Sequence, residues 1–426
     1  MNNTQNKKIS QITEDTLIVG VDIGSTTHYA RAFNWRGIEV GKVYRCGNCR
    51  DQFELFAKWM QQLSDVNGMN KILVGIEPTG HYWFNLGQYM ESCGIQICMV
   101  NPYHVKQSKE LDDNNQTKND SKDPKVIAKL VLEGRFSYPY MPCGVYADIR
   151  ILNNERLRST KKLIACKNRI ERWLSIYFPE YKSVFKNIEA PSSLLVLEKA
   201  CLPADVLTMG ENAINALWRE AKLKAVGIKK ATRLVDAAKN SIGQTCGSKA
   251  ARMQLQLLLQ EYKNQQEIEA QIMAEIEEIL PEVSGSQELL KIKGIGIKSI
   301  AGFIAEVGEI GRFSSPKQIQ KLAGLSLREN SSGKHKGETT ISRRGRARLR
   351  GILFNAVIPL LASNTSFQTI HAHYTKRENN PLKRKQSVVA ICCKLIRIFY
   401  AILKHGAVYD EQKMLQDIKW YGNKAA

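Results

Sequence analysis

The chain has 426 residues and a mass of 48.1 kDa, which is enough for two or three domains with cores of their own. Hydrophobic residues make up 43% and charged residues 24%, a composition that excludes a disordered or fibrous protein. No apolar run approaches the roughly 18 residues that a membrane span needs. The first ten residues also lack the apolar core of a signal peptide, so we predict a cytoplasmic protein with no membrane partner.

The net charge of +21 is concentrated in the last third of the chain. Residues 1–140 hold 16 basic and 15 acidic side chains, whereas residues 283–426 hold 25 basic and 9 acidic ones. The densest cluster is RRGRARLR at Arg343–Arg350. The alternative without a binding partner is a basic surface that only keeps the protein soluble. A cluster this dense favours a polyanionic partner, and we predict that the last third binds nucleic acid.

Residues 15–140 carry the pattern of an α/β domain. Three apolar runs follow one another closely, and helical patterns then alternate with two further strand patterns. Such a meander followed by alternating helices and parallel strands predicts a ribonuclease-H-like fold. The expected strands cover residues 17–23, 28–34, 38–44, 71–76 and 95–100, and the expected helices lie around 53–63 and 81–90.

The middle region, residues 145–282, shows almost no strand pattern. Its clearest element is a long helix over Arg252–Leu280, in which apolar residues recur at spacings of three and four before Pro281 ends it. Gln265 and Glu269 interrupt that apolar seam. Two alternatives remain open: a dimerising coiled coil, or an amphipathic helix that packs on its own domain.

Residues 283–410 are expected to form a mainly α C-terminal domain, with residues 411–426 as a polar tail. The segment from Lys293 to Lys298, KGIGIK, lies between two short helical patterns. It predicts a helix-hairpin-helix-like turn, in which Lys293, Gly294, Gly296 and Lys298 hold a phosphate without reading bases. The alternative is an ordinary glycine turn between packed helices.

Four carboxylates form the most informative pattern in the sequence. Asp22 and Glu77 each end a predicted strand, and Asp120 and Asp123 lie three residues apart near a predicted helix start at Pro124. Active sites of open α/β sheets lie at the carboxyl ends of strands. Grouped carboxylates are the ligands of Mg²⁺ or Mn²⁺ in phosphoryl transfer. Each acid alone has a structural alternative; Asp123, for instance, is a good helix cap.

The segment DIGSTT at Asp22–Thr27 has a rival interpretation. Actin-like ATPases and sugar kinases carry a similar first phosphate loop on a related strand order. They also need a second phosphate loop and an adenosine loop in a second copy of the fold. Residues 141–426 show neither pattern, so the sequence favours the metal-ligand interpretation.

A Ser-Ser-Gly segment at 331–333 stands among basic residues of the C-terminal region. Serine there could attack a phosphate, because nearby cations would stabilise the negative charge of the phosphoryl group. Spacing alone is weak support, since Ser/Gly loops are common. The basic residues in question are Lys334, Lys336, Arg343 and Arg344, and we predict that these four and Arg346 bind nucleic acid.

These residues together resemble a known family. The segments VGVDIGSTTH, IEPTGHYW, KNDSKDPKVIAKL, KIKGIGIKSI and LSLRENSSGKHKG occur in the order found in the DEDD transposases of bacterial insertion sequences. That family combines a RuvC-like N-terminal domain with a serine-bearing C-terminal domain, and its members are described as bridge-RNA-guided recombinases. The resemblance covers residues 17–410, although the helical middle matches only in character.

The resemblance implies a two-part active site. The four acids would be Asp22, Glu77, Asp120 and Asp123, and Ser332 would be the nucleophile that forms a phosphoserine link to DNA. It also implies a structured guide RNA and a dimer or tetramer. The family usually has alanine where this chain has Pro124, and Ser331 beside Ser332 leaves a one-residue ambiguity. Two other functions stay open: a RuvC-like nuclease that uses water, and a non-catalytic protein that binds structured nucleic acid.

Overall fold

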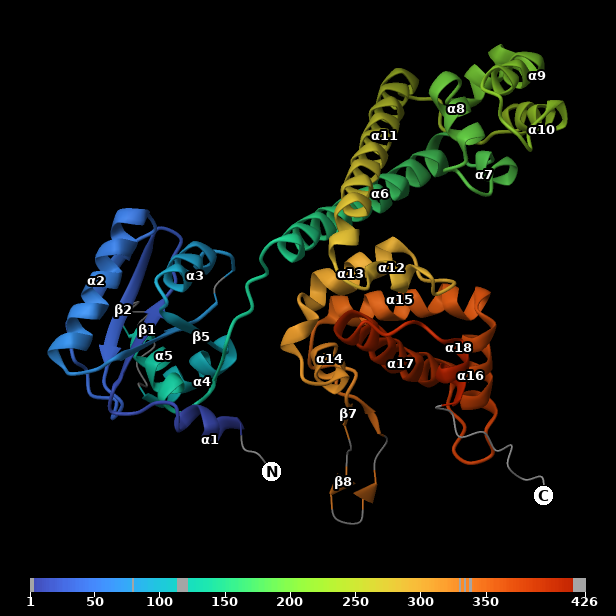
Figure 1. Ribbon diagram of the computed structural model, residues 1–426. Helices are drawn as coiled ribbons and strands as arrows, with labels where there is room; N and C mark the ends of the chain where they lie inside the picture. The colour runs from blue at the N-terminus through green and yellow to red at the C-terminus, as the bar shows by residue number, and fades with distance from the viewer. Residues whose placement is uncertain are drawn as a thin grey trace, which may run out of the picture. The chain divides into compact units, whose positions relative to one another are not determined.

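A computed structural model of the protein describes residues 4–78, 80–112, 122–328, 331–332, 335–336 and 339–416. The chain divides into two compact units, Met1–Met141 and Pro142–Ala426 (Figure 1).

The first unit is built on one six-stranded sheet with the strand order β3-β2-β1-β4-β5-β6. β1 pairs antiparallel with β2 and parallel with β4, and β4 pairs parallel with β5. This order fits the α/β ribonuclease-H-like domain that the sequence predicts. The strands are β1 (Thr16–Asp22), β2 (Thr27–Phe33), β3 (Tyr44–Gly47), β4 (Lys71–Ile76), β5 (Gln96–Val100) and β6 (Phe136–Ser137).

Two apolar clusters cover the two faces of this sheet. One includes Phe56 and Leu86 and lies under α2 and α3, and the other includes Ile127 and Val131 of α5. α2 buries Phe53, Phe56 and Met60, whose spacing places them on one helical face. The helices of this unit are α1 (Thr4–Ile9), α2 (Arg50–Val66), α3 (Trp83–Ser92), α4 (Pro102–Asp112) and α5 (Asp123–Leu132).

The third strand differs from the prediction of a strand at 38–44, which was wrong. The backbone turns directly after β2 because the Asn34 side chain accepts hydrogen bonds from the N–H groups of Arg36 and Ile38, both at 3.0 Å. Glu39 forms only an isolated bridge with Phe33 of β2, and continuous pairing with β2 begins at Tyr44. The short strand β6, which pairs antiparallel with β5, was not predicted either.

The second unit begins with a pair of long helices, α6 (Val145–Tyr177) and α11 (Ser248–Ile279), which lie side by side in Figure 1. The chain between them forms a cap at the end of this pair. Its core includes Trp173, Tyr181 and Trp218, all of them buried. The cap consists of α7 (Tyr181–Val184), α8 (Pro191–Lys199), α9 (Pro203–Glu220) and α10 (Ile228–Lys239).

The apolar seam of α11 is filled by the same chain. Leu258 and Tyr262 are buried in the cluster of the cap, and Ile276 is buried in the C-terminal core. Where the seam is interrupted, the Ser159 hydroxyl of α6 donates to the Gln265 side chain at 3.3 Å. These residues of α11 therefore match the second alternative, an amphipathic helix that packs within its own chain.

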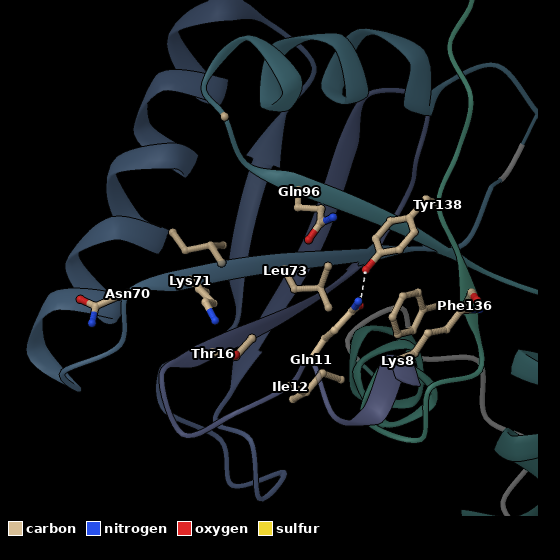
Figure 2. Close-up of a pocket in the computed structure, with 12 residues that line it drawn as sticks. Lys8, Gln11, Ile12, Thr16, Asn70, Lys71, Leu73, Gln96, Phe136 and Tyr138 are labelled. Atoms are coloured by element: carbon tan, nitrogen blue, oxygen red, sulfur yellow. Dashed lines mark hydrogen bonds between the residues drawn. The ribbon is translucent and has the colours of Figure 1, made fainter. Parts of the chain in front are cut away.

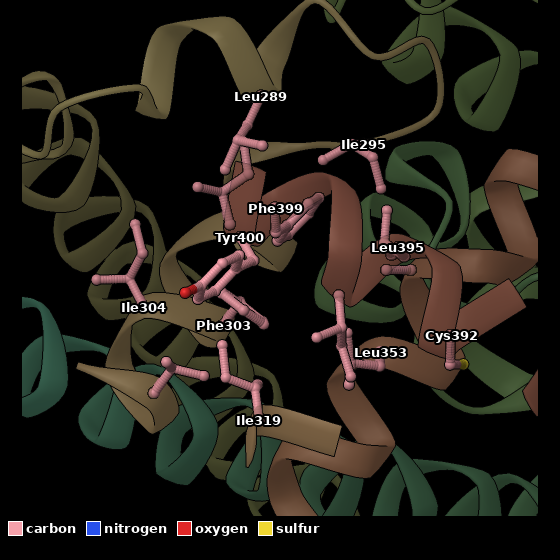
Figure 3. Packing of buried hydrophobic residues seen from close by; sticks show 14 of the residues in the cluster. Leu289, Ile295, Phe303, Ile304, Ile319, Leu353, Cys392, Leu395, Phe399 and Tyr400 are labelled. Carbon is pink, nitrogen blue, oxygen red and sulfur yellow. The ribbon is translucent and has the colours of Figure 1, made fainter. Parts of the chain in front are cut away.

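The C-terminal part of the second unit is a helical cluster around α17 (Arg384–His405), as expected for a mainly α region. Figure 3 shows Phe399 of this helix beside Phe303, and the two rings meet edge to face with centroids 4.9 Å apart. The surrounding helices are α12 (Ser286–Leu290), α13 (Ile297–Val307), α14 (Pro316–Leu322), α15 (Ala347–Ser363), α16 (Thr365–Lys376) and α18 (Glu411–Gln416), with short 3₁₀ turns at Leu280–Glu282 and Ile310–Arg312.

α17 is also the one helix in the described part of the chain that is long and apolar enough to cross a membrane. More than half of its most apolar stretch is buried within the protein. Its residues Ile391, Leu395 and Ile396 are completely covered by neighbouring helices. These contacts are those of a core helix.

Candidate functional site

Helix α5 lies directly against strand β1 because β1 has a glycine where the two meet. A Cβ atom on Gly20 would lie 1.9 Å from the carbonyl oxygen of Pro124 and 2.8 Å from the nitrogen of Ala128. Gly75 is the register partner of Gly20 on β4, and a Cβ there would lie 2.5 Å from Val131 Cγ2. The two paired glycines therefore let the whole helix approach the sheet closely.

Each of these glycines is followed two residues later by an acid. Side chains two residues apart along a strand share a face, so Asp22 follows Gly20 on the α5 side of the sheet. Glu77 is the first residue after β4 and lies within electrostatic range of Asp22. Val21 pairs with Ile76, and β1 and β4 therefore end side by side. The shared pattern Val-Gly-apolar-acid is a sequence signal for this arrangement that our sequence analysis missed.

Asp123 joins this edge from the first turn of α5. The close packing of Pro124 on Gly20 brings the start of the helix to the end of β1. The carboxylate of Asp123 accepts a hydrogen bond from the ammonium group of Lys109 on α4, a lysine that our sequence analysis did not single out. The fourth predicted acid, Asp120, lies outside the described residues.

The three described acids interact electrostatically. Glu77 is half-buried, and this burial raises the pKa of its carboxyl above the ordinary value. The negative charges of Asp22 and Asp123 raise that pKa further, whereas the positive charge of Lys109 lowers it. The acids therefore form one local concentration of negative charge, which Lys109 compensates in part.

The donor set fits a hard divalent cation, because Mg²⁺ and Mn²⁺ prefer carboxylate oxygens. Burial is the main cause of the raised pKa of Glu77, and the smaller contribution from the charges of Asp22 and Asp123 is expected of carboxylates that lie near one another. Among the described residues, however, no three carboxylate, histidine or cysteine side chains are already gathered at metal-ligand spacing. Completing the site therefore requires a rearrangement of side chains or a ligand from beyond these residues.

A pocket of about 260 Å³ lies elsewhere in the first unit and is separate from the acids. Figure 2 shows it at the amino ends of the parallel strands, beside Thr16, Lys71 and Gln96. The hydroxyl of Tyr138 donates to Gln11 Oε1 at 3.2 Å across it. The acids lie at the carboxyl ends of the same strands, so this pocket is not part of the candidate site.

The turn predicted to resemble a helix-hairpin-helix lies between α12 and α13. Gly294 has a φ of +97°, and a Cβ there would lie 2.9 Å from Ser363 Oγ, so its left-handed conformation and close packing both require glycine. Gly296 precedes α13 in open space, and Lys293 is exposed. Lys298 lies 2.7 Å from Glu269 of α11 and thus has a partner in the chain.

The arginine cluster divides into two groups. Arg346 donates to the carbonyl of Glu306 and lies 3.6 Å from the carboxylate of the same residue. Arg350 donates to the carbonyl of Ala323 at 2.9 Å. Arg343 and Arg344 are exposed. The structure thus gives Arg346 a role inside the protein and leaves Arg343 and Arg344 on the surface.

The candidate nucleophile lies on a β-extension that leaves the helical cluster beyond α14 (Figure 1). Strand β7 (Leu327–Arg328) pairs with β10 (Thr340–Ile341), and β8 (Ser331–Ser332) pairs with β9 (His335–Lys336). The register places Ser332 opposite His335 and Ser331 opposite Lys336. Lys334 lies outside the described residues.

These sequence and structural features agree with comparisons to known proteins. A family model of DEDD transposases of the IS110 type, described as "Transposase", matches residues 19–179. A second model, described as the transposase IS116/IS110/IS902 family, matches residues 286–374. The two matches together cover more than half of the chain and include every site residue discussed above. The chain belongs to this IS110-type family of transposases.

Several relatives share parts of the chain. The transposase for insertion sequence element IS1111A of Coxiella burnetii is 23% identical over 406 residues, which are 95% of this chain and 94% of that protein. The pilin gene-inverting protein of Moraxella bovis is 33% identical over 137 residues, or 31% of this chain, and the match spans only 41% of that protein. A probable family 20 transposase of Pseudomonas aeruginosa is 30% identical over 161 residues, 36% of this chain and 46% of that protein.

Proposed function

We propose that this protein is a DNA transposase that excises and inserts an insertion sequence by cleaving and exchanging DNA strands. The observation that carries the proposal is the acidic edge of the first unit, defined here as Asp22, Glu77 and Asp123. Two neighbouring parallel strands and a closely packed helix bring these acids within electrostatic range of one another. Relatives named as a transposase and as a gene-inverting protein support the same activity.

The acidic edge, with Asp120 as a fourth ligand, is proposed to hold Mg²⁺ or Mn²⁺. When bound, such a cation polarises the phosphate and stabilises charge during phosphoryl transfer. The protein's own part is to fix the carboxylates from rigid elements, which the contact between α5 and β1 achieves.

The proposed nucleophile is Ser332. Its Oγ would form a bond to phosphorus while the bond between phosphorus and a deoxyribose oxygen breaks. The serine proton would pass to a base or to water, and the departing deoxyribose oxygen would take up a proton from a general acid or from water. The product is a phosphoserine link and a free deoxyribose hydroxyl. A hydroxyl of another DNA strand could then attack the phosphoserine and join a new DNA end. The energy of the phosphodiester bond would thus be conserved through the exchange.

The partners follow from this proposal. The exposed Arg343 and Arg344, with Lys293, Lys334, Lys336 and the Gly294–Gly296 turn, are proposed to contact nucleic-acid backbone. We further propose that a structured RNA guides target choice, that the protein acts in the cytoplasm, and that it acts as a dimer or tetramer. The proposed functional regions are residues 15–140, 145–282 and 283–410, followed by the tail 411–426.

The test is to trap a covalent protein–DNA adduct. Purified protein with its co-purifying RNA is incubated with labelled DNA that carries the element ends and Mg²⁺, and adducts are resolved under denaturing conditions. We expect an adduct with the unmodified protein and with Ser331→Ala, and none with Ser332→Ala or Asp22→Asn. Sequencing the co-purifying RNA tests the guide.

Different results separate the alternatives. Adduct formation by Ser332→Ala but not by Ser331→Ala would move the nucleophile by one residue. Metal-dependent nicking without an adduct would support a RuvC-like nuclease that uses water. Binding without any cleavage, under conditions that keep the protein folded, would support a non-catalytic nucleic-acid-binding protein.

A further inference from the structure

Lys109 is a cation that contacts the acidic edge, at Asp123. It lies on α4, and its ammonium group donates to Asp123 Oδ2 at the start of α5. The Lys109 side chain is 39% exposed and the Asp123 side chain is 22% exposed, so the pair is reached by water but is not fully solvated. This ion pair links two helices that otherwise meet through apolar side chains such as Val105 and Ile127.

The influence of Lys109 extends beyond its direct partner. The positive charge of Lys109 opposes the rise in the pKa of Glu77 that burial, Asp22 and Asp123 cause. One ammonium group thus compensates part of the charge of the whole acidic edge. A lysine ammonium is a compact point charge on a flexible stem, which allows it to move away when another cation arrives.

We propose that Lys109 is a positioning residue of this site, which holds Asp123 in the cation-free protein and is displaced from it when a divalent cation binds. The inference rests on the proposed function, because it takes the acidic edge to be the cation site. Lys109 donates to one of the two oxygens of the Asp123 carboxylate, and a divalent cation held by this carboxylate would compete with the lysine for it. Binding of the two cations to Asp123 is therefore competitive, and the lysine weakens divalent binding while it stabilises the cation-free protein.

The experiment compares Lys109→Met with the unmodified full-length protein in the absence of nucleic acid. Mn²⁺ binding is measured by the loss of the free-ion paramagnetic resonance signal, and thermal unfolding is measured in EDTA and in excess Mn²⁺. For Lys109→Met we expect Mn²⁺ binding that is tighter by on the order of tenfold. We also expect a lower midpoint of unfolding in EDTA and a larger rise of that midpoint when Mn²⁺ is added.

Lys106→Met is the matched control, because Lys106 is an exposed lysine one turn earlier on α4 and its loss changes the net charge equally. We expect it to bind Mn²⁺ as the unmodified protein does. Lys109→Arg keeps a cation beside Asp123 and should also retain the original affinity. Lys109→Gln replaces Lys109→Met if the methionine variant does not fold, with the same expected direction.

Two results would overturn the inference, and they are distinguishable. Equal or weaker Mn²⁺ binding by Lys109→Met, with normal binding by the unmodified protein, would reject the role of Lys109 while leaving the metal site of the proposed function intact. No Mn²⁺ binding by the unmodified protein would reject both the lysine role and the cation site.

Discussion

The acidic edge of the first unit and the arginine cluster of the second unit place their charges in different ways. Asp22 and Glu77 end two paired strands, and Asp123 begins a helix that is fixed against one of them. In the arginine cluster, neighbours in sequence have different environments: Arg346 is bound to Glu306, whereas Arg344 is exposed. Charge counted along the sequence therefore identifies a binding region, but only the packing identifies which charges remain available.

The contrast has a physical cause. Backbone pairing of β1 with β4 fixes the main chain that carries Asp22, whereas Asp123 on α5 is also held by Lys109. Long cationic side chains reach several carbonyl and carboxylate groups, and burial of their stems favours such contacts. Lys298, which we predicted to contact phosphate, shows this as well, since it lies 2.7 Å from Glu269.

The largest effect is expected from a substitution that displaces α5 from β1. Gly20→Ala places a methyl group where Pro124 carbonyl oxygen lies 1.9 Å away, and a backbone atom cannot move aside as a flexible side chain can. We expect a loss of about 3 kcal/mol in the free energy of unfolding of the first unit, at the upper end of overpacking effects. Strand cleavage should fall as well, because Asp123 moves away from Asp22. Chemical denaturation and cleavage assays measure the two effects.

Gly47→Ala is the control for this prediction. Gly47 is also a strand glycine of the same sheet, but a Cβ there would meet the flexible side chain of Gln52 at 3.1 Å. We expect a change below about 1 kcal/mol, within the range of tolerated substitutions. Equal effects of the two substitutions would show that the α5 contact does not position the site.

Several elements were predictable because a single local property defines them. The buried strand β4 was predicted with its observed bounds from one apolar run, and the long helix α11 from apolar spacing and a terminating proline. β3 was displaced because a side-chain hydrogen bond of Asn34 turns the chain, and apolar patterning does not record such bonds. The seam of α11 predicted a partner but did not say that α6 is that partner, because pairing depends on long-range packing.

The candidate site was partly predictable for the same reason. Asp22 and Glu77 could be placed at one sheet edge from the strand ends alone. Lys109 could not be separated from Lys106, since both are lysines of one helix and only the tertiary structure brings Lys109 to Asp123. The repeated Val-Gly-apolar-acid pattern marks Gly20 and Gly75 in the sequence, but only the structure shows that α5 packs against both glycines.

A second test divides the arginine cluster by function. Replacing Arg343 and Arg344 together by Gln should weaken DNA binding and reduce its logarithmic salt dependence by up to about 0.9 for each lost phosphate contact. Stability should change little, because both side chains are exposed. Arg346→Gln should show the reverse, with a loss of roughly 1 kcal/mol of stability from its contacts with Glu306 and a smaller change of the salt slope.

Binding titrations at several salt concentrations, combined with denaturation curves, measure both quantities for each variant. An equal loss of salt slope in both sets of variants would mean that Arg346 leaves Glu306 when nucleic acid binds. An unchanged slope in the Arg343/Arg344 variant would show that these two side chains do not contact the phosphate backbone.

The smallest expected effect distinguishes the two units by pH. His28 of β2 is completely buried in the first unit, and burial lowers the pKa of its imidazole below 6.5, although the nearby Asn48 side chain opposes this shift. A histidine with a lowered pKa is neutral in the folded state and becomes protonated more readily in the unfolded state. Its contribution to stability is therefore fully present above about pH 6.5 and is lost as the pH falls toward the folded-state pKa.

We expect the first unit to lose up to about 1.4 kcal/mol of stability for each pH unit in this window, the limit for one linked proton. Hydrogen exchange of peptides covering β2 at pH 7 and pH 5.5 reports the change, after correction for the intrinsic exchange rates. His28→Leu cannot take up this proton, so the difference between variant and unmodified protein isolates the histidine from carboxylates such as Glu77. The raised pKa of Glu77 has the opposite effect on stability, because the folded state then takes up that proton more readily and gains stability as the pH falls. A loss of stability on acidification that persists in His28→Leu would therefore come from other groups. A response confined to the unmodified protein would instead show that a buried group on β2 makes the first unit sensitive to acid, independently of the surface charges of the second unit.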